Sequence, residues 1–166
     1  MLNQSQHYRG FTLVELMIVV MIIGLLAIIA IPRFSEMTGS ANGTNMMSQL
    51  QTIRTQLELY KLHHSGGYPE LNDVNGDGKM WDRLTLKTDF AGDITANGEF
   101  GPYLMDEPDN PFVKTSVVSN EVGEGVAWYY DQTLGKVQAV LPDSVDPANL
   151  GLNPGDYVML GAAEEE

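Results

Sequence analysis

The hydrophobic positions of this chain form two helical patterns and one strand pattern. Residues 11–32 read FTLVELMIVVMIIGLLAIIAIP, an apolar run whose only charged residue is Glu15. A second set of apolar residues follows the spacing of one helix face and predicts an amphipathic helix within residues 33–64. Farther on, apolar residues at 126–130 and 136–141 flank a turn-rich connection, which predicts a β-hairpin. The repeating positions of the amphipathic helix are Met46, Leu50, Ile53, Leu57 and Tyr60.

The first apolar run is long enough to cross a lipid bilayer. As a helix, residues 11–31 would extend about 31 Å, which matches the thickness of the hydrocarbon core. Apolar residues surround this helix on every side, whereas a helix that lies on a membrane surface keeps a polar stripe. A helix buried in a protein core is the alternative, but the rest of the chain has too little apolar material to enclose it. We therefore predict one membrane span at residues 11–32, with the C-terminal domain outside.

Glu15 is unusual because a carboxylate inside a membrane span costs about 2.5–3.5 kcal/mol on insertion scales. One interpretation is that it lies in the first helical turn, where the helix N-terminus favours a negative charge. The other interpretation is that it pairs with a cation inside the membrane. The sequence has no Lys or Arg between Glu15 and Pro32, so that cation would come from elsewhere. If the chain were cut after Gly10, Phe11 of a neighbouring copy would offer a free amine.

The sequence RGFTLVEL at residues 9–16 resembles the processing signal of type IV pilins and type II secretion pseudopilins. The order of polar leader, cut site and apolar run fits that family too, whereas an ordinary secretory signal is cut after its apolar run. The resemblance implies that a membrane prepilin peptidase cleaves after Gly10 and then methylates Phe11. It also implies that Glu15 pairs with the N-terminal amine of an adjacent subunit during assembly.

The same resemblance implies an α+β pilin fold, in which the outer half of a long N-terminal helix packs on a small antiparallel β-sheet. Filaments of this family unwind the helix locally between the positions that match Gly24 and Pro32, so we expect a helix break there. A break near Gly39–Gly43, which would give two helices, is the alternative. The chain then divides into a cleaved leader, a span that doubles as the assembly helix, and an exported domain, at residues 1–10, 11–32 and 33–166. The exported domain would contain a helix, a loop region, a sheet and a C-terminal segment, at residues 33–64, 65–112, 113–141 and 142–166.

Composition excludes several classes of function. The 166 residues include 22 Asp and Glu against 9 Lys and Arg, a net charge of −13, which is incompatible with nucleic-acid binding through basic clusters. There is no cysteine, so disulfides, thiolate metal sites and a cysteine nucleophile are excluded. The sequence has no nucleophile elbow, phosphate loop or histidine-based metal motif. We therefore do not expect an enzyme.

One loop has the spacing of a calcium site. Residues 73–78 read DVNGDG, the front half of a calcium-binding loop in which oxygen donors at alternate positions converge on one ion. The closing acidic residue is missing because the twelfth position is Leu84, so an acidic turn without an ion is the alternative. The expected ligands are the side chains of Asp73, Asn75 and Asp77 and the backbone carbonyl of Lys79.

Three functions fit these features. The leading hypothesis is a structural subunit of a bacterial type II secretion pseudopilus, which supports protein export and is anchored in the inner membrane before assembly. Its partners would be copies of itself, minor pseudopilins, prepilin peptidase, the inner-membrane assembly platform and membrane lipid. A type IV pilus subunit for adhesion, motility or DNA uptake is the first alternative, although many such pilins carry a C-terminal disulfide loop. A monomeric, membrane-anchored calcium-binding module is the second alternative and would keep its leader.

Overall fold

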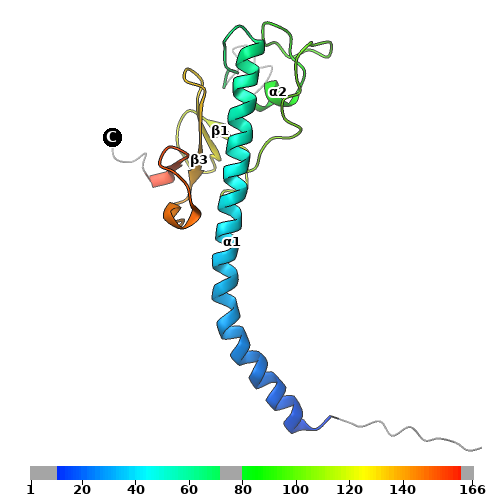
Figure 1. Cartoon of the computed structure of the whole chain (residues 1–166), viewed down its shortest axis with the longest axis vertical. Coiled ribbons are helices and arrows are strands. Elements are labelled where there is room, and N and C mark those ends of the chain that lie inside the picture. Colours follow the sequence, from blue (N-terminus) through cyan, green and yellow to red (C-terminus); the bar gives the residue numbers. More distant parts are fainter. Residues whose placement is uncertain (1–10, 72–79, 162–166) are drawn as a thin grey trace, which may run out of the picture. The chain divides into compact units, whose positions relative to one another are not determined.

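The computed structural model describes residues 11–71 and 80–161, with side chains throughout except at residues 30–37. It divides into two compact units, at residues 1–38 and 39–166, whose described parts are taken in turn below. Figure 1 shows the elements, and their mixture of helices and strands confirms the α+β class. In chain order they are α1 (Leu13–His63), α2 (Met80–Thr85), β1 (Val118–Ser119), β2 (Trp128–Asp131), β3 (Lys136–Leu141), the 3-10 helix η1 (Pro147–Leu150) and β4 (Tyr157–Met159).

Helix α1 is continuous from Leu13 to His63 and passes through Gly39 and Gly43. The alternative of two helices is therefore wrong for this chain. The predicted end near His64 is confirmed. There Ser65 adopts a left-handed conformation (φ 58°), and the backbone N–H of Gly66 donates to the carbonyl of Lys61 at 2.8 Å. This six-to-one hydrogen bond is the Schellman arrangement, which pairs a carbonyl that the helix end would leave free.

The core of the second unit lies between α1 and the sheet, and Figure 1 shows the strands along one side of the helix. The five α1 residues that predicted an amphipathic helix are each at most 3% exposed. Trp128 and Tyr130 of β2 are fully buried in the same core. Burying one large apolar side chain stabilises the fold by about 1.5–3 kcal/mol, so this shared layer holds the helix to the sheet. Met80, Trp81 and Leu84 of α2, a short helix inside the expected loop region, extend the same core.

The sheet has the strand order β1-β2-β3-β4. Strands β2 and β3 form the predicted antiparallel hairpin, in which Trp128 pairs with Ala139. The connection turns at Gly135, which has a φ of 63° that a residue without a Cβ adopts readily. The first strand, β1, lies within residues 113–141, where the sheet was expected, and it pairs in parallel with β2.

Two details of the predicted sheet are wrong. The sheet is mixed and not antiparallel, because β1 and β4 both pair in parallel with their neighbours. The sheet also extends beyond residues 113–141, since β4 in the C-terminal segment pairs with β3 through Ala139 and Tyr157. At three residues β4 is too short to show an alternating pattern, and its half-buried side chains give no clear apolar face. Its pairing depends on the path of the chain through η1, which is a tertiary feature.

Candidate assembly site

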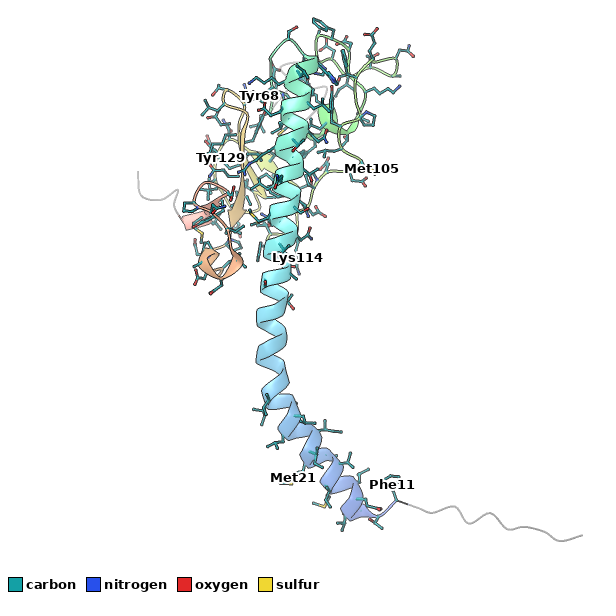
Figure 2. The ribbon with its side chains drawn as sticks, in the orientation of Figure 1. Phe11, Met21, Tyr68, Met105, Lys114 and Tyr129 are labelled. Atoms are coloured by element: carbon teal, nitrogen blue, oxygen red, sulfur yellow. The ribbon has the colours of Figure 1, made fainter. Side chains whose placement is uncertain are left out.

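Large apolar side chains are exposed along the described first part of α1. Phe11 is 82% exposed and Met21 is 79% exposed, and both are labelled in Figure 2. Val19 has the smallest exposure among the large apolar residues from Phe11 to Ile29, and it is still 46%. Monomeric soluble proteins rarely expose a continuous apolar surface of this extent, so such a surface marks contact with lipid or with other protein. This surface is the first component of the site.

Thr12 and Glu15 organise the start of α1. Because α1 begins at Leu13, Thr12 is the N-cap residue and Glu15 is the third helical residue. The backbone N–H of Glu15 donates to Thr12 Oγ1 at 3.2 Å, and the backbone N–H of Thr12 donates to Glu15 Oε2 at 2.9 Å. This reciprocal pair is a capping box, and it satisfies two backbone donors that a helix N-terminus otherwise leaves unpaired. The Thr12 hydroxyl also donates to Glu15 Oε2, at 2.9 Å.

The capping box leaves half of the Glu15 carboxylate available. Both contacts from Thr12 go to Oε2, and within the described residues no hydrogen bond reaches Oε1. Neither ion pair found in the described part of the chain involves Glu15. A carboxylate held in this way can accept a charge-assisted hydrogen bond from a cation that another molecule supplies. The site therefore combines a carboxylate held in a fixed position with an exposed apolar surface that is suited to contact with lipid or with other protein.

Comparison with known proteins agrees with this arrangement. Residues 5–31 match the family model for the prokaryotic N-terminal methylation motif. The chain is 38% identical over 154 residues to type II secretion system core protein G of Escherichia coli K12, and the alignment covers 92% of this chain and 97% of that protein. The chain belongs to the type IV pilin-like family.

Other pilin-like relatives match a smaller part of their own length. A fimbrial protein of Pseudomonas aeruginosa is 48% identical over 102 residues, which cover 53% of this chain and 66% of that protein. Type IV major pilin protein PilE1 of Neisseria gonorrhoeae is 29% identical over 136 residues, which cover 79% of this chain and 61% of that protein. The chain thus spans less than two thirds of these two relatives. No solved structure matches the chain.

As a pilin-like subunit, the chain is a structural protein and not an enzyme. Membership also implies processing by prepilin peptidase, anchoring in the inner membrane before assembly, and polymerisation. Among the described residues, no helix is both long enough and apolar enough to cross a membrane. The span at residues 11–32 stays a prediction.

The other N-terminal residues singled out in this pilin-like sequence are placed only in part. Gly10 lies outside the described residues, next to the exposed Phe11. Gly24 and Pro32 both lie within the continuous helix α1. A Cβ at Gly24 would meet nothing within 4 Å, so no contact in the single chain requires glycine there. The expected unwinding concerns the subunit in its filament and stays a prediction.

The calcium loop of this pilin-like chain cannot be placed. Asp73, Asn75, Asp77 and Lys79 all lie outside the described residues. Within residues 11–71 and 80–161, no group of three or more His, Cys, Asp or Glu is arranged to hold a metal ion. Calcium binding therefore stays a prediction from the spacing of the loop.

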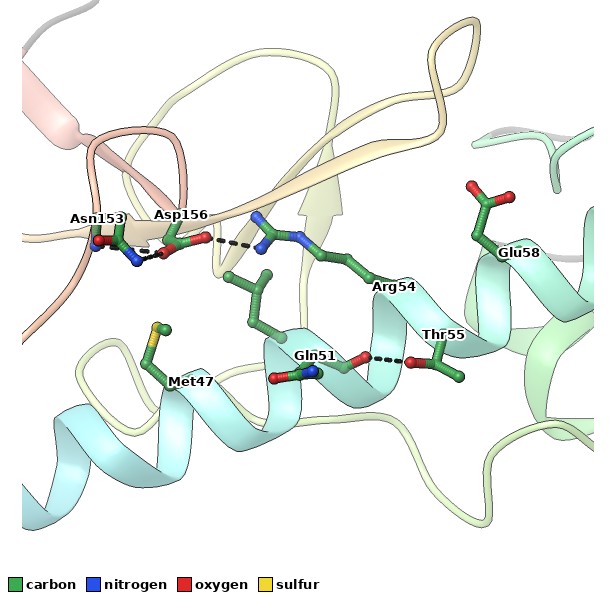
Figure 3. Close-up of a pocket in the computed structure, with 8 residues that line it drawn as sticks. Met47, Gln51, Arg54, Thr55, Glu58, Asn153 and Asp156 are labelled. Atoms are coloured by element: carbon green, nitrogen blue, oxygen red, sulfur yellow. Dashed lines mark hydrogen bonds and ion pairs between the residues drawn. The ribbon is translucent and has the colours of Figure 1, made fainter.

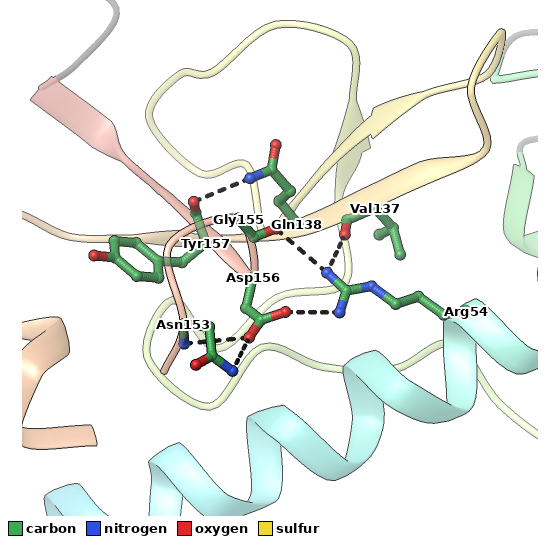
Figure 4. Close-up of polar contacts among 7 residues, drawn as sticks. All are labelled: Arg54, Val137, Gln138, Asn153, Gly155, Asp156 and Tyr157. Carbon is green, nitrogen blue, oxygen red and sulfur yellow. Dashed lines mark hydrogen bonds and ion pairs between the residues drawn. The ribbon is translucent and has the colours of Figure 1, made fainter. Parts of the chain in front are cut away.

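A polar site of the pilin-like domain was missed from the sequence. Arg54 on α1 donates from Nη1 to Asp156 Oδ1 at 2.7 Å and from Nη2 to the carbonyl of Val137 at 3.1 Å (Figure 4). The backbone N–H and the side-chain amide of Asn153 donate to the other oxygen of Asp156. Burial raises the pKa of the Asp156 carboxyl, but the hydrogen bonds from Arg54 and Asn153 outweigh burial, and the net pKa lies below its ordinary value. The one feature of the sequence that could have indicated this site was the position of Arg54, directly after the core residue Ile53.

A groove of about 420 Å³ lies beside this ion pair, between α1 and the turn that precedes β4 (Figure 3). Three of its lining residues are charged, namely Arg54, Glu58 and Asp156. Arg54 and Asp156 pair with each other, and Glu58 accepts a hydrogen bond from the Tyr68 hydroxyl, which in turn accepts one from Lys61 Nζ. The remaining lining residues are polar or apolar: Met47, Leu50, Gln51, Thr55 and Asn153.

Proposed function

We propose that this chain is a subunit of a type II secretion pseudopilus, cut by prepilin peptidase and polymerised through its N-terminal helix to support protein export. The observation that carries the proposal is the alignment with 97% of the length of core protein G from E. coli. The absence of cysteine agrees with it, because the C-terminal disulfide loop of many pilins cannot form in this chain.

The geometry of the assembly site supports a two-step mechanism. Cleavage after Gly10 would give Phe11 a free, positively charged amine. That amine would pair with Glu15 of the neighbouring subunit, whose Oε1 has no partner within the described chain. In apolar surroundings each charge would be costly alone, so pairing favours the arrangement in which both are neutralised. The exposed apolar surface of α1, which lipid would cover before assembly, would then be covered by the helices of other subunits, with close packing between helices as the favourable term.

The decisive test is Glu15→Ala in the full chain. The variant is expected to enter the membrane and to be cut, but to give no filaments that can be sheared from cells. The matched control is Glu99→Ala, which removes an exposed carboxylate of the exported domain and should leave the filament yield unchanged. A normal filament yield from Glu15→Ala would contradict the mechanism.

A type IV pilus subunit is the second candidate, and the similarity to the P. aeruginosa fimbrial protein favours it. Complementation separates the two candidates. A pseudopilin restores secretion to a strain that lacks core protein G, whereas a pilus subunit restores surface pili to a strain that lacks its major pilin. Genes for a secretin and secretion proteins beside this gene would favour the first, and genes for a retraction ATPase would favour the second.

A monomeric membrane-anchored module makes a different prediction about the N-terminus. It would keep residues 1–10, whereas a polymerising subunit would begin with N-methylphenylalanine at Phe11. Intact-mass and N-terminal peptide mass spectrometry of the protein purified from membranes distinguishes the two outcomes. Processing also removes Arg9, so the mature chain would carry one more net negative charge than the −13 of the full sequence.

A further inference from the structure

The C-terminal segment of the exported domain, residues 142–161, forms a loop whose two ends meet. The backbone N–H of Gly161 donates to Asp143 Oδ1 at 3.0 Å, which closes the loop. Inside it, the Asp146 side chain caps η1 by accepting the backbone N–H of Ala148 at 3.0 Å. We call this segment, drawn in orange and red in Figure 1, the strap.

The strap is packed less deeply than the strand beside it. Asp156 is the only buried residue among residues 142–161, all of which the structure describes. In β3, by contrast, every residue except Lys136 is buried. Segments with few buried side chains open locally at a free energy below that of global unfolding. The strap therefore meets the physical condition for opening while the rest of the domain stays folded.

One attachment of the strap lies at the turn before β4. Arg54 of α1 pairs with Asp156 at 2.7 Å. The backbone N–H of Ala139 in β3 donates to the carbonyl of Asp156 at 2.9 Å, and Gln138 Nε2 donates to the carbonyl of Tyr157 at 3.1 Å. This end of the strap is thus held by polar contacts to both the helix and the sheet.

The other attachment lies at Gly43 of α1, where η1 comes close to the helix. A Cβ at Gly43 would lie 3.0 Å from the carbonyl oxygen and 3.1 Å from the Cβ of Leu150, the last residue of η1. Both separations are closer than ordinary van der Waals contact, so η1 can lie this near α1 because position 43 has no side chain. A Cβ at Gly39, one turn earlier in the helix, would meet nothing within 4 Å.

We propose that the strap opens by local unfolding as one unit, with Gly43 and Arg54 as its two attachment points, while the rest of the exported domain stays folded. Opening separates β4 from β3 and leaves the backbone of residues 139–141 unpaired along that edge. An unpaired strand edge is a template for pairing with another chain. The closed strap therefore protects β3 from such pairing. Because the strap belongs to the single chain, its opening does not depend on the proposed function.

Hydrogen exchange of the unchanged full chain in detergent, resolved at single amides, tests the proposal. Ala139 and Val140 are neighbours in β3, but the N–H of Ala139 donates to Asp156 of the strap and the N–H of Val140 donates to Ala127, each at 2.9 Å. The protection factor of Ala139 should be close to that of Asp156 and at least about tenfold lower than that of Val140. Equal protection of Ala139 and Val140 would overturn the proposal.

Substitutions at the two attachment points test whether the strap is one unit. Gly43→Ala and Arg54→Met weaken opposite ends, and each should raise exchange about tenfold at Asn149 and at Asp156 alike. Gly39→Ala is the matched control, because it adds the same methyl group to the same helix in open space, and it should leave exchange of the strap unchanged. A rise confined to the end nearer each substitution, or no rise in Gly43→Ala, would overturn the proposal.

Gly135→Ala distinguishes local opening from global unfolding. Its Cβ would overlap the ring of Tyr68 and so destabilise the hairpin, which stays folded when the strap opens. Exchange at Val140 should therefore rise, whereas exchange at Asp156 should keep its rate. An equal rise at Val140 and Asp156 would mean that the strap opens only when the whole domain unfolds, and it would overturn the proposal.

Discussion

The guanidinium of Arg54 lies 2.7 Å from the carboxylate of Asp156, although 102 residues separate them in the chain. Arg54 comes from the C-terminal part of α1, and Asp156 comes from the turn directly before β4. The pair therefore ties the C-terminal strand to the helix, as Figure 4 shows. Asp156 is largely buried, with a side chain that is 11% exposed, whereas the Arg54 side chain is 39% exposed.

Removing the cation should destabilise the exported domain. In Arg54→Met, the buried carboxylate of Asp156 loses its charged partner but keeps the bonds from Asn153. We expect a loss of about 1–3 kcal/mol, toward the lower value because solvent screens the exposed guanidinium. Thermal unfolding of the full chain in detergent, followed by fluorescence of the buried Trp81 and Trp128, measures the change. Arg54→Lys is the control and should lose less, because it keeps the charge without the forked geometry.

The same pair predicts a dependence of stability on acid. Because the folded pKa of Asp156 is lowered, its stabilisation is complete above the unfolded pKa of about 3.9 and is lost as the pH falls through the folded value. The unchanged chain should therefore lose stability below about pH 4 more steeply than Asp156→Asn, which cannot titrate there. Acid-unfolding curves measured in parallel for the two proteins would reveal this difference in steepness. Curves of equal steepness would contradict the stabilising role of the ionised Asp156.

Gly135 and Gly151 provide a matched pair for testing packing in the exported domain. Both have a positive φ, of 63° and 69°, so alanine pays the same backbone strain at either position. A Cβ at Gly135 would overlap the ring of Tyr68, whereas a Cβ at Gly151 would meet nothing within 4 Å. We expect Gly135→Ala to be less stable than Gly151→Ala by about 1–3 kcal/mol, the usual cost of overpacking. Equal melting temperatures would mean that Tyr68 moves aside at no cost.

The Thr12 hydroxyl should matter for assembly because it holds Glu15 in place. Thr12→Val removes both side-chain contacts of the capping box, whereas Thr12→Ser keeps an oxygen that can replace them. We expect filament yield to fall in the valine variant and to stay near normal in the serine variant. Mass spectrometry of Phe11 in both variants is the control, since a failure of cleavage would explain low yield by a different route.

Calcium binding can be tested directly on the full chain in detergent. Isothermal titration of the unchanged protein with calcium should show binding, and Asp77→Ala should abolish it because that residue is one of the expected oxygen ligands. Asp106→Ala, which changes an exposed acid elsewhere, is the matched control. Absence of binding in the unchanged protein would favour the alternative of an acidic turn without an ion.

The local sequence pattern predicted an element reliably where apolar residues recur often enough on one face of that element. The period of Met46, Leu50, Ile53 and Leu57 predicted both α1 and its buried face, because a helix places residues at that spacing on one side. The hairpin of β2 and β3 was predicted for a similar reason, since its two strands are adjacent in the chain. The glycines at positions 39 and 43 suggested only the alternative of two helices, which is wrong because helix propensity is a weak influence on its own.

By itself, the sequence determined the processing motif, the apolar run, the position of Glu15 and the buried face of the helix, because each depends on residues close together in the chain. It also determined the acidic, cysteine-free composition. Only the tertiary structure decided the parallel pairing of β4 and the bond between Arg54 and Asp156. These depend on which distant segments meet when the core closes, and that is set by packing across the whole domain.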